Sequence, residues 1–332
     1  MVTTTCGRLS ICRHHRKAQH GSYGLDTTVE LEINGTMQRV RLCAERSGLP
    51  PVLIVQAGPG LPVINEAAKF QQRLQLEKSF SVAYWDQRGC GRAALQDVQD
   101  ISLDTQVDDL RVVVRWLVER TGQQVVVLGI SLGATLALLA ADREPGGIKA
   151  LVAVSIDADT AASDTAAFSF LREVATEADK RKMARLIKKL GAPPYATPMP
   201  FQLRARLLTD LGGIEHGKRF GELLRSLLHS LIRTYGWLGT ATALRNMNAI
   251  QRALLPELAR LNLFSNWPRP AIPVHYIFGS SDPLVPLSLV EKVSRVATHE
   301  DTVVVVPNSG HMVHFDEPTI VRSIIVQAHF AS

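Results

Sequence analysis

Six short, continuous apolar runs constrain the fold of this chain more than any other feature of its sequence. Short runs rich in Val, Ile and Leu are typical of strands buried on both faces of a sheet. Helix-like stretches separate most of the runs, so the sequence predicts an α/β fold, a mostly parallel sheet with helices on both faces. The runs lie at residues 52–55, 81–85, 125–128, 150–154, 273–278 and 302–306.

The order of these runs divides the chain into a core and an insert. Residues 28–33 and 37–43 alternate apolar and polar side chains around Asn34-Gly35, which predicts a β-hairpin. After residue 157 the alternation of strand-like and helix-like stretches stops, and a long helix-like stretch rich in Leu, Arg and Lys follows. We therefore expect an α/β core at 26–157 and 263–332, a helical cap at 158–262, and a basic, disordered N-terminal extension at 1–25.

Positive charge is concentrated in the extension and the cap. The 332 residues carry a formal net charge of +6, with 46% hydrophobic and 20% charged residues, as is ordinary for a globular enzyme. The extension holds four basic and no acidic residues, and the cap holds sixteen Lys or Arg against nine Asp or Glu. Neither region has a nucleic-acid motif or interleaved aromatic residues, so we expect a solvated helical surface and no nucleic-acid partner.

The cysteines and the N-terminus favour a cytoplasmic protein. Cys6, Cys12, Cys43 and Cys90 show no paired CxxC spacing, which argues against a zinc site and a disulfide scaffold. The N-terminus lacks the apolar segment of a secretory signal, and the uncharged run 125–141 is short for a membrane span. We expect no metal, no cofactor and no membrane partner.

A glycine-flanked serine follows the third apolar run, in the sequence Gly129-Ile130-Ser131-Leu132-Gly133. It stands between a predicted strand and a helix-like stretch, the context of a nucleophile elbow. The glycines allow a tight turn, and the turn lifts the serine hydroxyl above the sheet. A purely structural glycine-rich turn is the alternative, but the context favours Ser131 as a nucleophile.

A serine nucleophile needs a histidine base that is itself oriented by a carboxylate. In sheets with such an elbow, the acid and the histidine follow the serine, each after a late strand. Asp282 follows the run 273–278, and His311 follows the run 302–306. Both lie at the carboxyl ends of predicted strands, where such sheets gather their sites, so we assign Asp282 as the acid and His311 as the base.

Two alternatives to this pair stay open. His314 could be the base, although it lies closer to a predicted helix start. Asp157 could be the acid, because it ends the strand before the cap, although a contact with the cap is the role we favour for it.

Catalysis of this kind also needs N–H donors aimed at the developing oxyanion. The backbone N–H of Leu132, directly after the nucleophile, is one candidate. The second is expected in the loop Gln56-Ala57-Gly58-Pro59-Gly60 after the first run. We choose Gly58, since a glycine lets the backbone approach a substrate closely.

Several of these segments together resemble the proline iminopeptidase-related α/β-hydrolases, a peptidase S33-like family. The resemblance implies an α/β-hydrolase fold with an inserted helical cap and a Ser-His-Asp triad. It also implies that the segment 86–92 braces the loops of the site, so Asp86 is not assigned as a catalytic acid. The resemblance covers most of residues 28–330 and rests on Ile33-Asn34-Gly35, Gly58-Pro59-Gly60, Trp85-Asp86-Gln87-Arg88-Gly89-Cys90-Gly91-Arg92, the elbow, Ala192-Pro193-Pro194-Tyr195 and Gly310-His311.

The chain departs from the family pattern in two places. The family's usual His-Gly-Gly-Pro-Gly loop reads Gln56-Ala57-Gly58-Pro59-Gly60 here, which keeps the donor glycine but replaces the histidine. Family members also use cap carboxylates to bind the free amine of the substrate, whereas this cap is net basic. The acidic residues available for that role in the cap are Glu173, Glu177, Glu215 and Glu222.

The sequence therefore predicts hydrolysis of an ester, lactone or amide bond through an acyl-enzyme on Ser131, in a small molecule or a short peptide. An aminopeptidase that releases N-terminal proline is the named alternative. A non-catalytic ligand-binding relative is a third hypothesis, against which the complete predicted triad argues.

Overall fold

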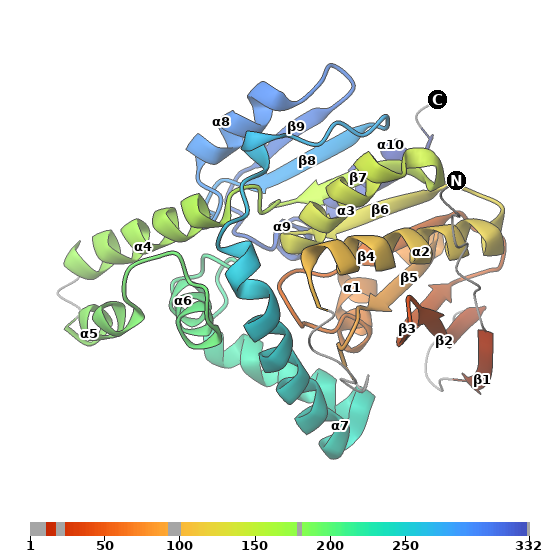
Figure 1. Cartoon of the computed structure of the whole chain (residues 1–332), viewed down its shortest axis with the longest axis horizontal. Helices are drawn as coiled ribbons and strands as arrows, with labels where there is room; N and C mark the ends of the chain where they lie inside the picture. The colour runs from red at the N-terminus through yellow and green to blue at the C-terminus, as the bar shows by residue number, and fades with distance from the viewer. Residues whose placement is uncertain (1–10, 18–23, 92–100, 178–180, 331–332) are drawn as a thin grey trace, which may run out of the picture.

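One nine-stranded sheet runs through the described part of the chain, which in this computed structural model comprises residues 11–17, 24–91, 101–177 and 181–330. The strand order is β1-β2-β3-β5-β4-β6-β7-β8-β9 (Figure 1). The pairs from β1 to β5 are antiparallel, and those from β5 through β4 to β9 are parallel. The strands are β1 (Ile11–Lys17), β2 (Leu25–Ile33), β3 (Thr36–Ala44), β4 (Pro51–Val55), β5 (Ser81–Asp86), β6 (Val125–Ile130), β7 (Ile148–Val154), β8 (Val274–Gly279) and β9 (Thr302–Val306).

Helices cover both faces of the sheet, and alternate residues of the central strands pack against opposite layers. In β4, Val52 and Ile54 belong to the apolar cluster that includes α1 and α10, whereas Leu53 and Val55 belong to the cluster that includes α2, α3 and α8. This is why the strand is apolar throughout, and the predicted α/β class is confirmed. The flanking helices are α1 (Ala67–Leu74), α2 (Leu103–Thr121), α3 (Leu132–Arg143), α8 (Leu287–Val296) and α10 (Pro318–Phe330).

Four helices lie between β7 and β8, inside the range predicted as the cap. They are α4 (Thr160–Glu177), α5 (Arg181–Leu190), α6 (Pro198–Asp210) and α7 (Phe220–Leu258), and Figure 1 shows them grouped to one side of the sheet. The first three share an apolar cluster of their own. Helix α7 bends at Gly236 (φ 71°, ψ 177°), and beyond the bend Ile250 and Leu254 join the core cluster. The cap is therefore packed against the core as well as within itself.

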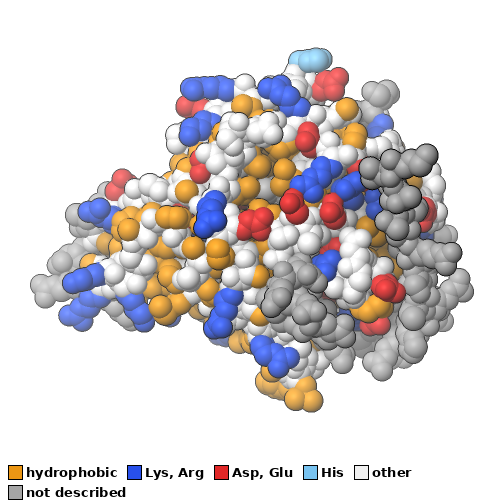
Figure 2. Space-filling view, viewed as in Figure 1, with side chains coloured by type: hydrophobic (Ala, Val, Ile, Leu, Met, Phe, Trp, Pro, Cys, Tyr) orange, Lys and Arg blue, Asp and Glu red, His pale blue; other side chains and the backbone are white. Residues whose placement is uncertain are grey.

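The surplus of basic charge lies mainly on the outside of these helices. Arg206, Arg225, Arg233 and Arg245 are all exposed, and Figure 2 shows Lys and Arg side chains spread over the outer surface on this side of the molecule. Water and salt screen charges in such positions, so they act only weakly on a buried site.

The bend of α7 is fixed to the core through Asp86 at the end of β5. One oxygen of this buried carboxylate accepts the N–H groups of Val63 (2.8 Å) and Ile64 (2.9 Å). The other accepts the hydroxyl of Tyr235 (2.6 Å), one residue before Gly236. Asp86 thus ties a core loop to the cap, which agrees with the bracing role expected of this segment; Arg92, at its end, lies outside the described residues.

The N-terminal extension differs from its prediction. Instead of being disordered throughout, Ile11–Lys17 forms β1 and pairs antiparallel with β2, in a register that places Ile11 opposite Leu31. The edge of β2 would otherwise present unpaired N–H and C=O groups, which a polar segment can bind as readily as an apolar one. Residues 1–10 and 18–23 of the extension, which include Cys6, lie outside the described part of the chain.

Among the described residues, no helix combines the length and the apolar character needed to cross a membrane. Cys43 and Cys90 are buried free thiols.

Candidate active site

Ser131 occupies a sharp turn between β6 and α3. Its backbone has φ 52° and ψ −119°, a conformation that side-chain-bearing residues rarely adopt, and its N–H donates to the carbonyl of Val154 (2.8 Å). A Cβ atom at Gly129 would lie 2.5 Å from Ala134 Cα, and one at Gly133 would lie 2.2 Å from Val55 O. The two glycines are thus required by the close approach of neighbouring backbone.

Asp282 and His311 meet at the carboxyl ends of β8 and β9. His311 Nδ1 lies 2.7 Å from Asp282 Oδ2, and both residues are 5% exposed. The other carboxylate oxygen accepts the N–H groups of Leu284 (2.8 Å) and Val285 (3.2 Å), which fixes the orientation of the acid. Because a carboxylate can only accept, Nδ1 carries the proton, and Nε2 of a neutral ring is left free to act as a base.

A cavity of about 490 Å³ brings Ser131 and His311 together with both candidate oxyanion donors. Gly58 lines this cavity with a positive φ of 71°, and Leu132 lines it at the first position of α3. The N–H groups in the first turn of a helix have no intrahelical acceptor, so the Leu132 N–H is available to a ligand. Asp282 does not line the cavity and lies behind His311.

The walls of the cavity are mostly apolar, and many of them come from the cap. Sequence reasoning did not identify these residues, although the apolar repeat at the start of α7 is the signal that could have pointed to them. The apolar cap residues in the wall include Phe201, Phe220, Leu223, Leu224, Leu227, Leu244 and Met247.

Charged side chains also reach the cavity, and most have partners there. Of the four candidate cap glutamates, Glu215 lines the cavity, and it pairs with Lys69 at 2.6 Å. Glu66 accepts the hydroxyl of Ser230 (2.8 Å). Arg204 is buried and pairs with Asp164. Among the described residues, no group of three or more His, Cys, Asp or Glu side chains is arranged to hold a metal ion.

Asp157, the alternative acid, lines the same cavity but is held differently from Asp282. Its Oδ2 accepts the hydroxyl of Thr160 (2.8 Å), and its buried Oδ1 has no hydrogen-bond partner within the described structure. Burial raises the pKa of this carboxyl group. The imidazole of His311 is hydrogen-bonded to Asp282, so the geometry favours Asp282 as its partner.

His314, the alternative base, is a buried core residue. It is 1% exposed and lies against Phe70 and Phe315, with ring centroids 5.4 Å and 4.1 Å apart. Neither ring nitrogen has a partner among the described residues, and His314 does not line the cavity. Burial lowers the pKa of the ring well below its usual value, so the side chain stays neutral.

We expect His314→Leu to stabilise the fold, because it removes a buried polar group without partners, which costs about 1–3 kcal/mol. Below the unfolded-state pKa of about 6.5, the unfolded chain protonates this histidine while the folded chain does not, so the wild type loses stability as pH falls. The gain should therefore be larger at pH 5 than at pH 8, as measured by urea unfolding. His299→Leu, at an exposed position, is the control and should change stability little; a destabilised His314→Leu variant would contradict the prediction.

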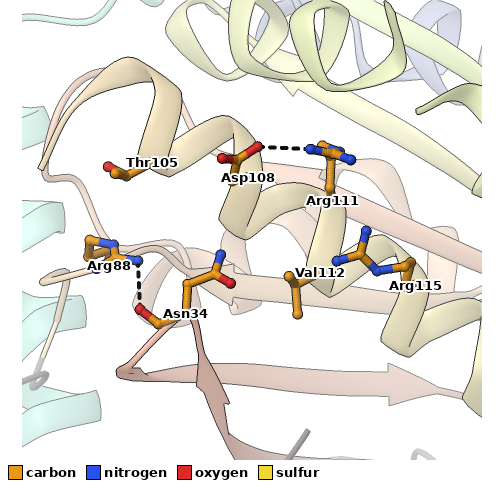
Figure 3. Close-up of a pocket in the computed structure, with 7 residues that line it drawn as sticks. All are labelled: Asn34, Arg88, Thr105, Asp108, Arg111, Val112 and Arg115. Atoms are coloured by element: carbon orange, nitrogen blue, oxygen red, sulfur yellow. Dashed lines mark hydrogen bonds and ion pairs between the residues drawn. The ribbon is translucent and has the colours of Figure 1, made fainter. Parts of the chain in front are cut away.

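A second cavity of about 330 Å³ lies beside α2 (Figure 3), and it shares no lining residue with the cavity that contains Ser131. Its arginines are already paired with carboxylates: Arg88 with Asp109 (2.8 Å), Arg111 with Asp108 (2.9 Å), and Arg115 with Glu144 (2.7 Å). We assign no function to it.

A family model described as "alpha/beta hydrolase fold" matches residues 50–318. The chain belongs to the alpha/beta hydrolase fold family. It is 26% identical over 298 residues to the "Probable aminopeptidase YbaC" of Bacillus subtilis (strain 168), which covers 88% of this chain and 92% of that protein. The resemblance to the α/β-hydrolases is thereby confirmed, and these findings support a hydrolase.

Two solved structures of the same fold span nearly the whole chain. VinJ aligns with a TM-score of 0.65 at 15% identity, covering 92% of this chain and 98% of VinJ. A proline iminopeptidase-related protein from Thermus thermophilus aligns with a TM-score of 0.60 at 18% identity, covering 91% of this chain and 96% of that one. At these identities the likeness supports the fold of this alpha/beta hydrolase alone.

Proposed function

We propose that this hydrolase cleaves an acyl bond through a covalent intermediate on Ser131. The observation that carries the proposal is the 2.7 Å contact between His311 Nδ1 and Asp282, in a histidine that shares one cavity with Ser131. An imidazole oriented in this way can take the serine proton on Nε2 while the carboxylate stabilises the resulting imidazolium.

The first half of the proposed reaction forms an acyl-enzyme. Ser131 Oγ attacks the carbonyl carbon as its proton passes to His311, and the N–H groups of Leu132 and Gly58 bind the oxyanion of the tetrahedral intermediate. The intermediate collapses when His311 gives this proton to the leaving oxygen or nitrogen. In the second half, water attacks the acyl-enzyme with His311 again as base, which releases the carboxylic acid and restores Ser131.

The apolar cavity favours an ester, lactone or amide with an uncharged acyl group. Its volume of about 490 Å³ is sufficient for a small molecule. An ammonium group entering the cavity would lose its hydration, at a high cost unless an unpaired carboxylate meets it. The cap glutamate in the wall, Glu215, is already neutralised by Lys69.

Aminopeptidase action on a free N-terminus, including release of N-terminal proline, is the second candidate. It is favoured by the name of the Bacillus subtilis relative and by the carboxylates of Glu66, Asp157 and Glu215 in the cavity wall. Glu66 and Asp157 are not in direct ion pairs with Lys69, so either carboxylate could bind the amine of a substrate.

A substrate panel tests the two candidates. We expect kcat/KM for p-nitrophenyl esters and lactones with neutral, apolar acyl groups to exceed that for prolyl-naphthylamide, after correction for the intrinsic lability of the ester. Fluorophosphonate pretreatment should abolish both activities.

Two variants separate the possible outcomes of the panel. Selective cleavage of prolyl-naphthylamide that is lost in Glu66→Gln or Asp157→Asn would establish the aminopeptidase instead. Glu222→Gln, on the exposed face of α7, is the matched control and should leave both activities unchanged. Hydrolysis that persists after complete labelling of Ser131 would exclude the proposed nucleophile.

A further inference from the structure

A short segment of the cap, residues 213–216 between α6 and α7, is hydrogen-bonded to the loop that carries His311. The backbone N–H of His311 itself donates to Gly213 O (3.0 Å), and the N–H of Met312 donates to Ile214 O (2.8 Å). The backbone of the candidate base is therefore held by the cap, although its side chain is held by a core residue.

The same segment also contacts the loop of the acid. A Cβ atom at Gly213 would lie 2.6 Å from Pro283 Cγ, directly after Asp282 in the chain. A Cβ atom at Gly310 would lie 2.7 Å from Gly213 O. Both glycines are thus needed for the close approach of the segment to the two loops that meet at the Asp282–His311 contact.

Asp316 joins the segment to the histidine loop from the other side. Its Oδ2 accepts the N–H of Gly310 (2.8 Å), and its Oδ1 accepts the N–H of His216 (2.9 Å). The Glu215–Lys69 ion pair fastens the segment to α1 in addition. One carboxylate thus bridges the residue before the candidate base and the end of the cap segment.

We infer that residues 213–216 and Asp316 form a clamp that positions His311 against Asp282. The position of the cap segment then determines whether His311 can act as a base. This inference rests on the proposed function. Asp316 is a positioning residue, because it acts through His311 and lies outside the residues that line the cavity. A misplacement of a catalytic group by about 1 Å can lower the rate about 100-fold, so small shifts of this loop matter.

Asp301 provides a matched control. Like Asp316, it accepts two backbone N–H groups from different segments, Val274 (2.9 Å) and Thr298 (2.7 Å). It lies at the amino-terminal ends of β8 and β9, whereas the candidate site is at their carboxyl ends. Asp301→Ala therefore removes the same kind of bridge without touching the histidine loop.

The test compares Asp316→Ala with Asp301→Ala on the best neutral ester. We expect Asp316→Ala to lower kcat about 10- to 100-fold with little change in KM. The acid limb of its kcat/KM profile should move to lower pH, because a histidine displaced from its carboxylate is a weaker base. Asp301→Ala should keep kcat and the pH profile of the wild type, whatever its melting temperature. Asp316→Asn retains one acceptor oxygen and should recover part of the rate.

The outcomes distinguish this inference from the proposed function. Equal kcat losses in Asp316→Ala and Asp301→Ala, or an unchanged pH profile in a folded Asp316→Ala, would overturn the clamp while leaving the triad intact. If Asp316→Ala does not fold, Gly213→Ala probes the same contact through Pro283, and full activity in that variant would overturn the clamp. A wild type that fluorophosphonate does not label at Ser131 would instead refute the proposed function.

Discussion

Ser131→Ala is expected to lower kcat by about four to six orders of magnitude, because only the hydroxyl is lost and no other group can form the acyl-enzyme. The fold should be retained, since alanine keeps the Cβ atom and the backbone N–H that donates to Val154. Activity against a p-nitrophenyl ester, with fluorophosphonate labelling and peptide mapping, measures both effects. The labelled peptide should contain Ser131 in the wild type, and labelling should be absent in the variant.

Ser155→Ala is a matched control for this change. Ser155 also follows a central strand, has a positive φ of 46° and is buried, but it does not line the cavity. Its replacement should leave turnover near the wild-type value. His311→Ala should be about as damaging as Ser131→Ala, and the double variant should lose little more, because the members of a triad act as a unit. A Ser131→Ala variant with most of its activity would refute the assignment.

Asp282→Asn is expected to lower kcat about 10⁴-fold. An amide at this position no longer fixes the proton on Nδ1 of His311, and it cannot stabilise the imidazolium by charge. The backbone N–H groups of Leu284 and Val285 can still donate to the amide oxygen, so the loop should keep its shape. Steady-state kinetics over a range of pH measure the loss.

Asp157→Asn is the comparison for the acid. Its carboxyl group is buried in the same cavity, but the hydrogen bond shown by the structure is to Thr160 rather than to His311. Its effect should be at least tenfold smaller than that of Asp282→Asn. The reverse ranking would place the acid at the end of β7 and would require His311 to turn away from Asp282.

The core and the candidate triad could be predicted from the sequence because their signals are local. The buried central strands are continuous apolar runs. Ser131 follows β6 directly, whereas Asp282 and His311 lie a few residues after β8 and after β9, an apolar run that is only partly buried. The order of these motifs along the chain then supplied the pairing of acid and base. The carboxyl ends of neighbouring parallel strands meet at one edge of the sheet, so residues that follow such strands are expected to lie close together.

The parts that could not be predicted depend on contacts between distant segments. Nothing in the composition of residues 213–216 indicates that the carbonyl of Gly213 accepts the N–H of His311, almost a hundred residues later. The strand at Ile11–Lys17 has a polar and basic sequence without an apolar run, and its pairing with the edge of β2 is a contact between distant segments. The net charge of the cap was also a poor guide to its cavity, because most of that charge lies outside.

The bend at Gly236 determines how this protein could be rebuilt by exchanging caps with its relatives. The predicted cap ends at residue 262, but the arm of α7 after the bend carries Ile250, Leu254 and Leu258 into the core cluster beneath it. A cap exchanged at residue 262 would therefore take with it the arm of α7 that packs in the core cluster. A graft cut at Gly236 would leave that arm in place and exchange only the helices before it, so we expect the exchangeable unit of this protein to end inside a helix rather than in a loop.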